Sequence, residues 1–280
     1  PEEKAATYED VFAIVERDVK PVRALNKRPA RRDRWWQYAE RAPHLYKAIS
    51  CVDDVIVLAL VSRTVIPARV KASQVFAHKL CAFSTDKSSQ LAALSSNFHS
   101  LWAWKHSSTM KADLNYSPSD VYETFPRPKI NGDLTAAGNA LESSQRLAAA
   151  HRSVGLTKLY NLVHAEAEQG ADIERVRRAH VEVDEAGAEA YGWTDLGLKH
   201  GFHETRQGTR FTIAPAVQTE ILDRLLELNH ARYQEEQKAG LHVPGARKKA
   251  SPARKPAAKP EPKADEGFQD GLFVHPNGLF

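Results

Sequence analysis

The spacing of apolar residues divides the first 130 residues into helical and sheet segments. Apolar positions recur every three or four residues near the N-terminus and again after residue 86, which is the spacing of a helix with one buried face. Between these segments lie an apolar run of strand length and a stretch in which apolar and polar residues alternate. The pattern predicts helices over 6–25, 43–49 and 87–105, and strands over 54–61, 65–70 and 74–83. Residues 107–128 are polar and interrupted by prolines, so an ordered loop is expected there.

Helical spacing dominates from Leu134 to Gly240. Four helices are predicted, over 134–151, 156–168, 172–190 and 216–238. Four glycines interrupt 191–212, which predicts an irregular segment there. After residue 240 the sequence is rich in Pro, Ala and Lys and poor in large apolar residues, so a disordered basic tail is expected over 241–280.

These elements predict an α+β fold. A mixed β-sheet domain with packed helices is followed by a helical C-terminal region and the basic tail. The expected boundaries are 1–30 for a connecting helix and basic linker, 31–128 for the sheet domain, 129–240 for the helical domain and 241–280 for the tail.

Charge adds an expectation about the partner. The 280 residues carry a net charge of +4, yet residues 20–34 hold seven Lys/Arg against one Asp, and 241–264 hold seven against one Glu. Two basic segments on an otherwise acidic chain are typical of a protein that binds an anionic partner, most often nucleic acid. A solvated linker and a solvated tail would have the same composition, so charge alone leaves both interpretations open.

Composition also limits the cellular compartment and the classes of protein to which the chain can belong. Two cysteines, Cys51 and Cys81, are too few for a disulfide scaffold or a four-thiolate zinc site. The low cysteine count fits a reducing cytoplasm, which is the expected location. No apolar run reaches the length of a membrane span, so no membrane contact is expected. The chain begins with Pro1 rather than Met, which suggests a fragment or a processed chain.

Motifs for catalysis are missing from the sequence. No glycine-rich turn of the kind that holds a nucleotide cofactor follows a predicted strand, and no Asn-Pro-Pro-aromatic loop or nuclease metal motif occurs. The stretch His200-Gly-Phe-His203-Glu204 lacks the spacing of a zinc helix. We therefore predict no catalytic, cofactor-binding or metal site within these residues.

Polar side chains beside the predicted strands are the candidates for DNA contact, because Arg, Lys, Asn and Gln read base edges, whereas Ser, Thr and basic side chains hold phosphates. The candidates for reading bases are Arg63, Thr64, Lys71, Gln74, Lys111, Asn115 and Tyr116. The candidates for phosphate contact are Lys27, Arg28, Arg31, Arg32, Arg34, Arg69, Ser108 and Thr109. Plain solvated loops remain the alternative.

Several stretches resemble the C-terminal half of large adenine-specific DNA methyltransferases, a group that includes the MmeI-like (type IIG/IIL) restriction–modification enzymes and methylases of phage-defence islands. The resemblance rests on Trp35-Trp36-Gln37-Tyr38, Arg41-Ala42-Pro43-His44-Leu45-Tyr46, Val61-Ser62-Arg63-Thr64 and the long stretch from Ser108 to Glu123-Thr124-Phe125-Pro126. Leu156 to His164, Tyr191-Gly192-Trp193 and Leu225 to His230 resemble the helical segment that follows in that group. Together these stretches lie within residues 8–240.

The resemblance implies a target recognition domain that selects a site on double-stranded DNA. In that family an N-terminal methyltransferase domain or subunit binds S-adenosylmethionine and methylates adenine, and the target base is extruded from the duplex. The motifs of that domain are not in this chain, so it is expected to lack methyltransferase activity alone and to hold no cofactor.

Two other classes of protein stay open. One is an intact enzyme whose acid–base residues lie among the Asp, Glu and His of 172–204. The other is a helical adaptor that binds nucleic acid nonspecifically through its basic segments.

Overall fold

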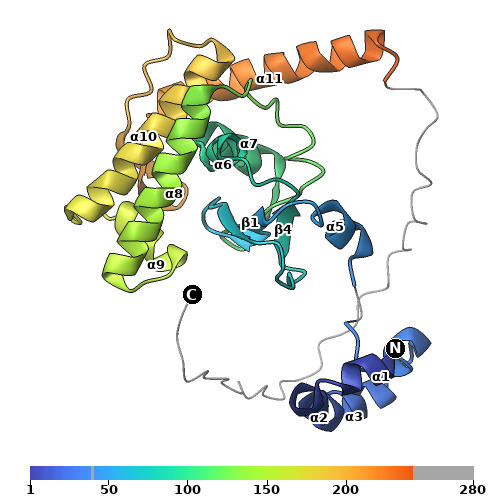
Figure 1. Cartoon of the computed structure of the whole chain (residues 1–280). Coiled ribbons are helices and arrows are strands. Elements are labelled where there is room, and N and C mark those ends of the chain that lie inside the picture. Colours follow the sequence, from blue (N-terminus) through green and yellow to red (C-terminus); the bar gives the residue numbers. More distant parts are fainter. Residues whose placement is uncertain (39–40, 242–280) are drawn as a thin grey trace, which may run out of the picture. The chain divides into compact units, whose positions relative to one another are not determined.

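The computed structural model describes residues 1–38 and 41–241 (Figure 1). Two compact units are present. The first comprises Pro1–Ile56, Val70–Phe76 and Ala82–Asp86, and the second comprises Val57–Arg69, Ala77–Cys81 and the described residues from Lys87 to Leu241. The tail predicted over 241–280 lies outside the described residues, apart from Leu241.

The first unit begins with short helices where one long helix over 6–25 is predicted. They are α1 (Glu2–Ala6), α2 (Glu9–Asp18), α3 (Lys20–Ala24), α4 (Pro29–Arg32) and α5 (Pro43–Ala48). The single-helix prediction is wrong because Tyr8 leaves the helical region of backbone space, and Pro21 has no N–H to continue the ladder of α2. The short helix predicted over 43–49 is confirmed.

Trp35 is the aromatic centre of the first unit. It is buried, and its ring centroid lies 5.2 Å from that of Phe12 on α2 and 5.8 Å from that of Trp36. Arg23 of α3 donates hydrogen bonds to the carbonyl oxygens of Trp35 and Gln37, the first at 2.9 Å. These contacts fix residues 35–37, which directly follow the basic segment 20–34, against α2 and α3.

A three-stranded sheet has the strand order β3-β1-β4. Its strands are β1 (Asp54–Ala59), β3 (Ala68–Lys71) and β4 (Leu80–Phe83). Four consecutive residues of β1 are buried, as expected for its apolar run. The strand predicted over 74–83 exists only in its last four residues. The alternation over 74–79 suggests a strand with one buried face, but Val75, an apolar residue expected on that face, is 65% exposed.

The helix predicted over 87–105 is two helices, α6 (Ser88–Ser95) and α7 (Asn97–His106). Ser96 separates them with an extended backbone (ψ 153°), and its hydroxyl accepts a hydrogen bond from the His99 amide. A capping serine therefore ends one helix and begins the next without a loop.

The segment predicted as a loop over 107–128 contains a hairpin of β5 (Ser108–Met110) and β6 (Asp113–Asn115). Strand β2 (Val61–Ser62) pairs with β6 on the other side, so the antiparallel sheet has the order β2-β6-β5. These strands are too short and too polar to show a period in the sequence.

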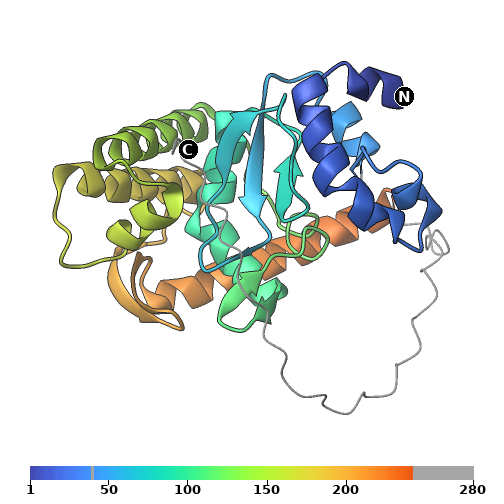
Figure 2. The same ribbon diagram turned by 90° about the horizontal axis from the view of Figure 1, so that it is seen from below.

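Helices α8 (Gly132–Arg152) and α10 (Ala171–Tyr191) lie side by side in both views (Figures 1 and 2). Leu134, Leu141 and Val183 are fully buried in the core between them, together with Ala92 of α6. Helix α9 (Leu156–Val163) is shorter than the predicted 156–168. Its Leu159 and Val163 pack with Ile173 of α10 in a second buried apolar cluster.

The segment predicted as irregular over 191–212 contains a second hairpin, β7 (Gly201–Thr205) and β8 (Gly208–Thr212). Phe202 and Phe211 lie opposite each other in its register, and Gly208 adopts a φ of 87° beside the turn. Clustered glycines concealed the alternation of this hairpin. Helix α11 (Pro215–Lys238) follows as predicted, and its Asn229 donates to the Thr124 carbonyl oxygen at 2.6 Å.

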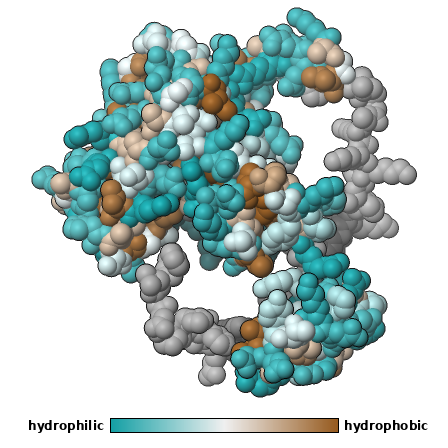
Figure 3. Space-filling model, viewed as in Figure 1, coloured by the Kyte–Doolittle hydropathy of each residue, from teal (hydrophilic) through white to brown (hydrophobic). Residues whose placement is uncertain are grey.

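The predicted α+β fold class is confirmed. The two compact units do not follow the linear boundaries at residues 30, 128 and 240, which stay a prediction. The face drawn in Figure 3 is mostly hydrophilic, with small separate apolar patches.

Gly138 marks the closest approach of two helices in the second unit. A Cβ atom at this position would lie 2.1 Å from the Ser88 carbonyl oxygen at the start of α6. We expect Gly138→Ala to lower the free energy of unfolding by about 1–3 kcal/mol, because a backbone atom cannot move aside as a side chain would. Urea unfolding followed by circular dichroism measures this change.

Gly132 in the same helix is the matched control. A Cβ atom there would meet no atom within 4 Å. Gly132→Ala should leave the urea midpoint unchanged or raise it slightly, since alanine favours the helix. Equal midpoints for the two variants would contradict the close-contact explanation.

Candidate nucleic-acid interface

The sheet β2-β6-β5 in the second unit brings six of the predicted DNA-contact residues together. Ser62 lies opposite Leu114, so the next residue, Arg63, reaches Asp113, with 3.4 Å between Nε and Oδ1. The Arg63 side chain is 72% exposed, and an ion pair this exposed is weak enough to yield to a DNA ligand. The residues on this edge are Arg63, Thr64, Ser108, Thr109, Lys111 and Asn115.

Lys111 forms the tip of the β5–β6 hairpin. Met110 pairs with Asp113, which leaves a turn of two residues, and Lys111 adopts a φ of 57°. A lysine in the left-handed region is unusual, because its Cβ crowds the backbone there. The turn projects an exposed ammonium from a hydrogen-bonded ladder. Behind it, Asn115 Nδ2 donates to Ser108 Oγ at 3.0 Å, which orients that amide.

The β7–β8 hairpin adds residues that the sequence pattern did not single out. Gln207 at its tip donates from Nε2 to the Arg63 carbonyl oxygen at 2.7 Å. Arg206 and Arg210 accompany it, so three further polar side chains join the Arg63 loop. The signal that could have found them is the Gly208 turn between Thr205 and Thr209, with a basic residue on each side.

A buried carboxylate fixes this hairpin in the second unit. Asp184 of α10 has no exposed surface and accepts 2.7 Å hydrogen bonds from the Asn97 amide, from Asn97 Nδ2 and from His200 Nε2. Thr212 at the end of β8 donates to Asn97 Oδ1 at 2.8 Å. The start of α7 and both ends of the hairpin segment are therefore tied to one carboxylate.

Arg177 supports the hairpin from the other side. Its side chain is 3% exposed, and its guanidinium donates to the carbonyl oxygens of Val163 at 2.8 Å and Ala165 at 2.7 Å, at the end of α9. The same group lies over the rings of Phe202 (4.9 Å) and Phe211 (5.9 Å). A buried cation is retained here because carbonyls and aromatic faces replace its hydration.

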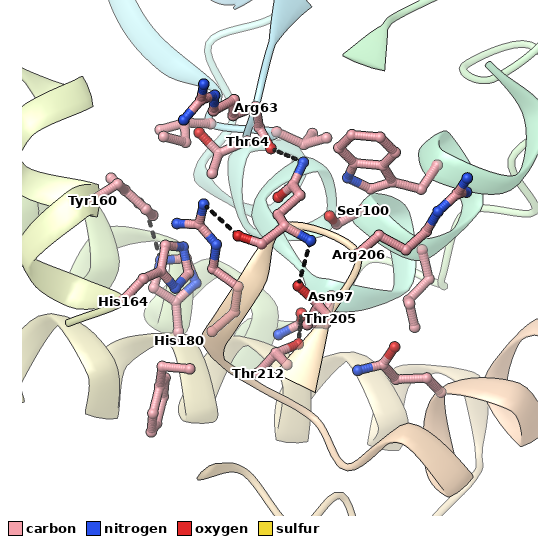
Figure 4. Close-up of a pocket in the computed structure, with 18 of the residues that line it drawn as sticks. Arg63, Thr64, Asn97, Ser100, Tyr160, His164, His180, Thr205, Arg206 and Thr212 are labelled. Atoms are coloured by element: carbon pink, nitrogen blue, oxygen red, sulfur yellow. Dashed lines mark hydrogen bonds between the residues drawn. The ribbon is translucent and has the colours of Figure 1, made fainter. Parts of the chain in front are cut away.

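A cavity of about 520 Å³ lies behind the tip of the hairpin. Figure 4 shows Tyr160, His164 and His180 gathered on one side of it, and Arg206 on the other. Arg63 and Thr64 form its rim. The volume is within the range of small-ligand pockets.

The first unit carries the remaining basic candidates. Lys27, Arg28, Arg32 and Arg34 are exposed around α4, and Arg31 is half-buried. Arg32 Nε lies 3.0 Å from Asp33 Oδ1. At the end of β3, Lys71 Nζ lies 2.9 Å from Asp54 Oδ1, and the Gln74 side chain on the following turn is exposed.

The environments of Tyr116 and Arg69 do not suit DNA contact. Tyr116 is 3% exposed, and its hydroxyl lies 3.0 Å from His99 Nε2, so it belongs to the core. Arg69 lies 2.7 Å from Ser88 Oγ and 3.3 Å from Glu142 Oε2, with only 19% of its side chain exposed. The sequence placed both beside polar loops but could not reveal these buried partners.

Residues 172–204 hold the acid–base candidates of the alternative enzyme hypothesis. Asp184 and His200 bond each other, and His180 Nε2 lies 2.7 Å from the Tyr160 hydroxyl. Within the described ranges, no three His, Cys, Asp or Glu side chains cluster as metal ligands would. Among the helices that the structure describes, none is both long and apolar enough to cross a bilayer.

Comparison with known proteins adds two findings. Residues 2–129 match the family model described as MmeI, target recognition domain. The fold resembles the solved structure of the type IIL restriction–modification enzyme MmeI in complex with DNA, with a TM-score of 0.51 and 15% sequence identity. The match covers 80% of this chain and 26% of that chain, so this chain spans about a quarter of that enzyme. No curated protein matches the sequence.

Three histidines in the interior of the second unit, the fully buried His99 and the partly buried His164 and His180, make its stability depend on pH. Burial lowers the pKa of His99 to about 4, that of His164 to about 3 and that of His180 to about 4. In an unfolded chain each pKa is about 6.5. All three imidazoles are therefore neutral in the folded protein at pH 7.

Stability should fall as the pH is lowered from 6.5 towards 4. In that window the histidines are protonated in the unfolded chain but not in the folded protein. Each of them therefore lowers the free energy of unfolding by up to ~1.4 kcal/mol per pH unit. Above pH 6.5 neither state is protonated and the full stability is present. Urea midpoints at half-unit pH steps measure the slope, and His99→Gln should reduce it. His230→Gln, which alters an exposed side chain on α11, should not. A slope unaffected by His99→Gln would contradict the assignment.

Proposed function

We propose that this chain selects the double-stranded DNA sequence on which a restriction–modification enzyme acts, because residues 2–129 match the family model described as MmeI, target recognition domain. The observation that carries the proposal is the edge of the β2-β6-β5 sheet, where Asn115 lies on a hydrogen-bonded ladder, and Arg63 and Lys111 directly follow its strands β2 and β5. Short turns carried on a rigid sheet hold their side chains in place, which is what direct contact with base edges requires.

The two units supply different kinds of contact in this proposal. The sheet edge of the second unit offers both donors and acceptors, which discriminate base pairs in the major groove. The exposed cations around α4 of the first unit have no such scaffold, so they contact phosphates and contribute affinity without sequence preference.

The methyl donor expected from the resemblance does not fit the described residues. S-adenosylmethionine sites of this kind place a glycine-rich turn between a strand and a helix. Here the strand-to-helix connections are 84–87, 116–131 and 213–214, and none of them contains a glycine. We therefore propose that an N-terminal methyltransferase domain or subunit holds the cofactor and methylates adenine, in the cytoplasm.

Selection of binding sites from a random duplex library tests the proposal with the full chain. A single enriched motif, bound more tightly than unselected duplex, is the expected outcome. Equal binding of all duplexes would instead support the alternative of a helical adaptor with nonspecific nucleic-acid binding.

Lys111 offers a test of base reading. We expect Lys111→Ala to cost about 1–3 kcal/mol on the selected site and to relax preference at one base pair, if its ammonium reads a base. Lys111→Gly suits the φ of 57° and preserves the turn, so it should lose the same preference without lower stability.

Lys158 on α9 is the matched control for charge. It is exposed and lies outside the sheet edge, so Lys158→Ala should retain the selected motif. Competition binding with single-base variants of the site measures each preference. If Lys111→Ala and Lys111→Gly both keep the full motif, Lys111 is not a base reader.

Arg32 tests the phosphate role of the basic segment. Arg32→Ala should weaken binding to every sequence alike and reduce the slope of log K against log salt by about 0.9. Arg17 of α2 is a close match, because it too is exposed and pairs with the aspartate that follows it. Titrations at several salt concentrations should show an unchanged slope for Arg17→Ala. Loss of site preference in Arg32→Ala would contradict the division of roles.

A further inference from the structure

The cavity behind the β7–β8 hairpin has an unbalanced charge. Its lining includes the cations Arg63, Lys105, Arg206 and Arg210 and a single carboxylate, Glu204. Arg63 has the partner Asp113 outside the lining, whereas Lys105, Arg206 and Arg210 have no carboxylate within ion-pair distance among the residues that the structure describes. The cavity therefore favours an anion.

The histidines of the lining do not alter this balance. Burial and the nearby charge of Arg210 lower the pKa of His164 to about 3, and burial lowers that of His180 to about 4. Both imidazoles are neutral at pH 7, so the positive charge comes from the arginines and the lysine. A neutral imidazole can also accept a hydrogen bond, which a cation cannot.

Three polar atoms of the lining are buried without any hydrogen-bond partner in the described protein. They are Ser95 Oγ, His164 Nδ1 and Arg210 Nε. Burying a polar group without a partner costs free energy, so such groups are rare in folded proteins. Three of them around one cavity indicate a ligand with several polar atoms.

Apolar and aromatic side chains form the remaining walls. Trp104 of α7 is half-buried there, and Val65, Ile66 and Leu101 line the same space. An indole face beside cations suits a planar ring that carries an anionic group. The volume of about 520 Å³ exceeds the need of a bare inorganic anion.

We propose that this cavity binds a nucleoside monophosphate, with its phosphate at Arg210 and its base against Trp104. The nucleotide is either free in solution or a single unpaired unit of a nucleic-acid strand, since both present the same chemistry. Ser95 and His164 supply the hydrogen bonds that the sugar or the base edge requires. The site shares the Arg63 loop with the proposed DNA-reading edge but is a separate binding function.

Isothermal titration of the full chain with dAMP, dCMP, dGMP and dTMP tests the inference, with inorganic phosphate and the four nucleosides as partial ligands. At least one monophosphate should bind more tightly than its nucleoside and more tightly than phosphate. Absence of binding by every monophosphate at millimolar concentration would overturn the proposal.

Variants separate the phosphate and base contributions. Arg210→Gln should weaken monophosphate binding about tenfold or more, as expected for loss of a charged hydrogen bond. Arg206→Gln removes an exposed cation of the lining, so it should also weaken monophosphate binding. Because an exposed side chain is changed, this variant gives a result even if Arg210→Gln does not fold. Trp104→Ala should weaken monophosphates but leave inorganic phosphate unchanged. Arg175→Gln on exposed α10 surface removes the same charge outside the cavity and should bind normally.

The remaining outcomes are decisive. Binding that is equal for phosphate and all monophosphates, and insensitive to Trp104→Ala, would overturn the nucleotide assignment in favour of a simple anion. Competition by a duplex with one unpaired nucleotide, but not by a fully paired duplex, would identify a strand as the source. Competition by neither duplex would identify the free nucleotide. A chain that selects a duplex motif yet binds no monophosphate refutes this inference alone, whereas the reverse result refutes only the proposed function.

Discussion

Burial of the Asp184 carboxylate is the constraint on which the proposed recognition surface of the second unit depends. A carboxylate without solvent is stable only if hydrogen-bond donors surround it, and here three donors come from two residues, Asn97 and His200. The backbone amide and the side-chain amide of Asn97 lie at the first residue of α7, where a helix favours negative charge. His200 supplies the third donor just before β7. Displacing any one of these donors would leave the buried carboxylate with an unsatisfied acceptor, which costs free energy, so the elements are held in one arrangement.

This arrangement explains why the C-terminal part contributes to a surface that the sequence places only in the N-terminal part. Asn97 also accepts a hydrogen bond from Thr212 at the end of β8, and the Arg177 guanidinium packs against the two phenylalanine rings of the hairpin. With both of its ends fixed, the hairpin carries Gln207 to the carbonyl oxygen of Arg63, 144 residues away in sequence. The family match ends at residue 129, yet the hairpin that completes this edge lies beyond it.

The same packing sorts the titratable groups into two kinds. Desolvation keeps His99, His164 and His180 neutral. His99 bonds to Tyr116 and to a backbone carbonyl, and His180 bonds to Tyr160. The arginines of the hairpin are only partly buried and find no carboxylate among the described residues close enough to form an ion pair. Neutral groups inside and unpaired cations at the rim give the cavity its preference for anions.

The sequence by itself determined the long helices, the buried strand β1 and the chemical character of the two basic segments. These features depend on local periodicity and composition, which are visible without a fold. It also indicated Arg63, Lys111 and Asn115 as contact residues, because polar side chains beside strands belong to exposed edges. Only the tertiary structure decided that Tyr116 and Arg69 are occupied internally, since burial by distant residues leaves no local pattern. It alone also decided that Arg206, Gln207 and Arg210 join this edge, because the interaction that brings them there links residues of α7 and α10 through one buried carboxylate.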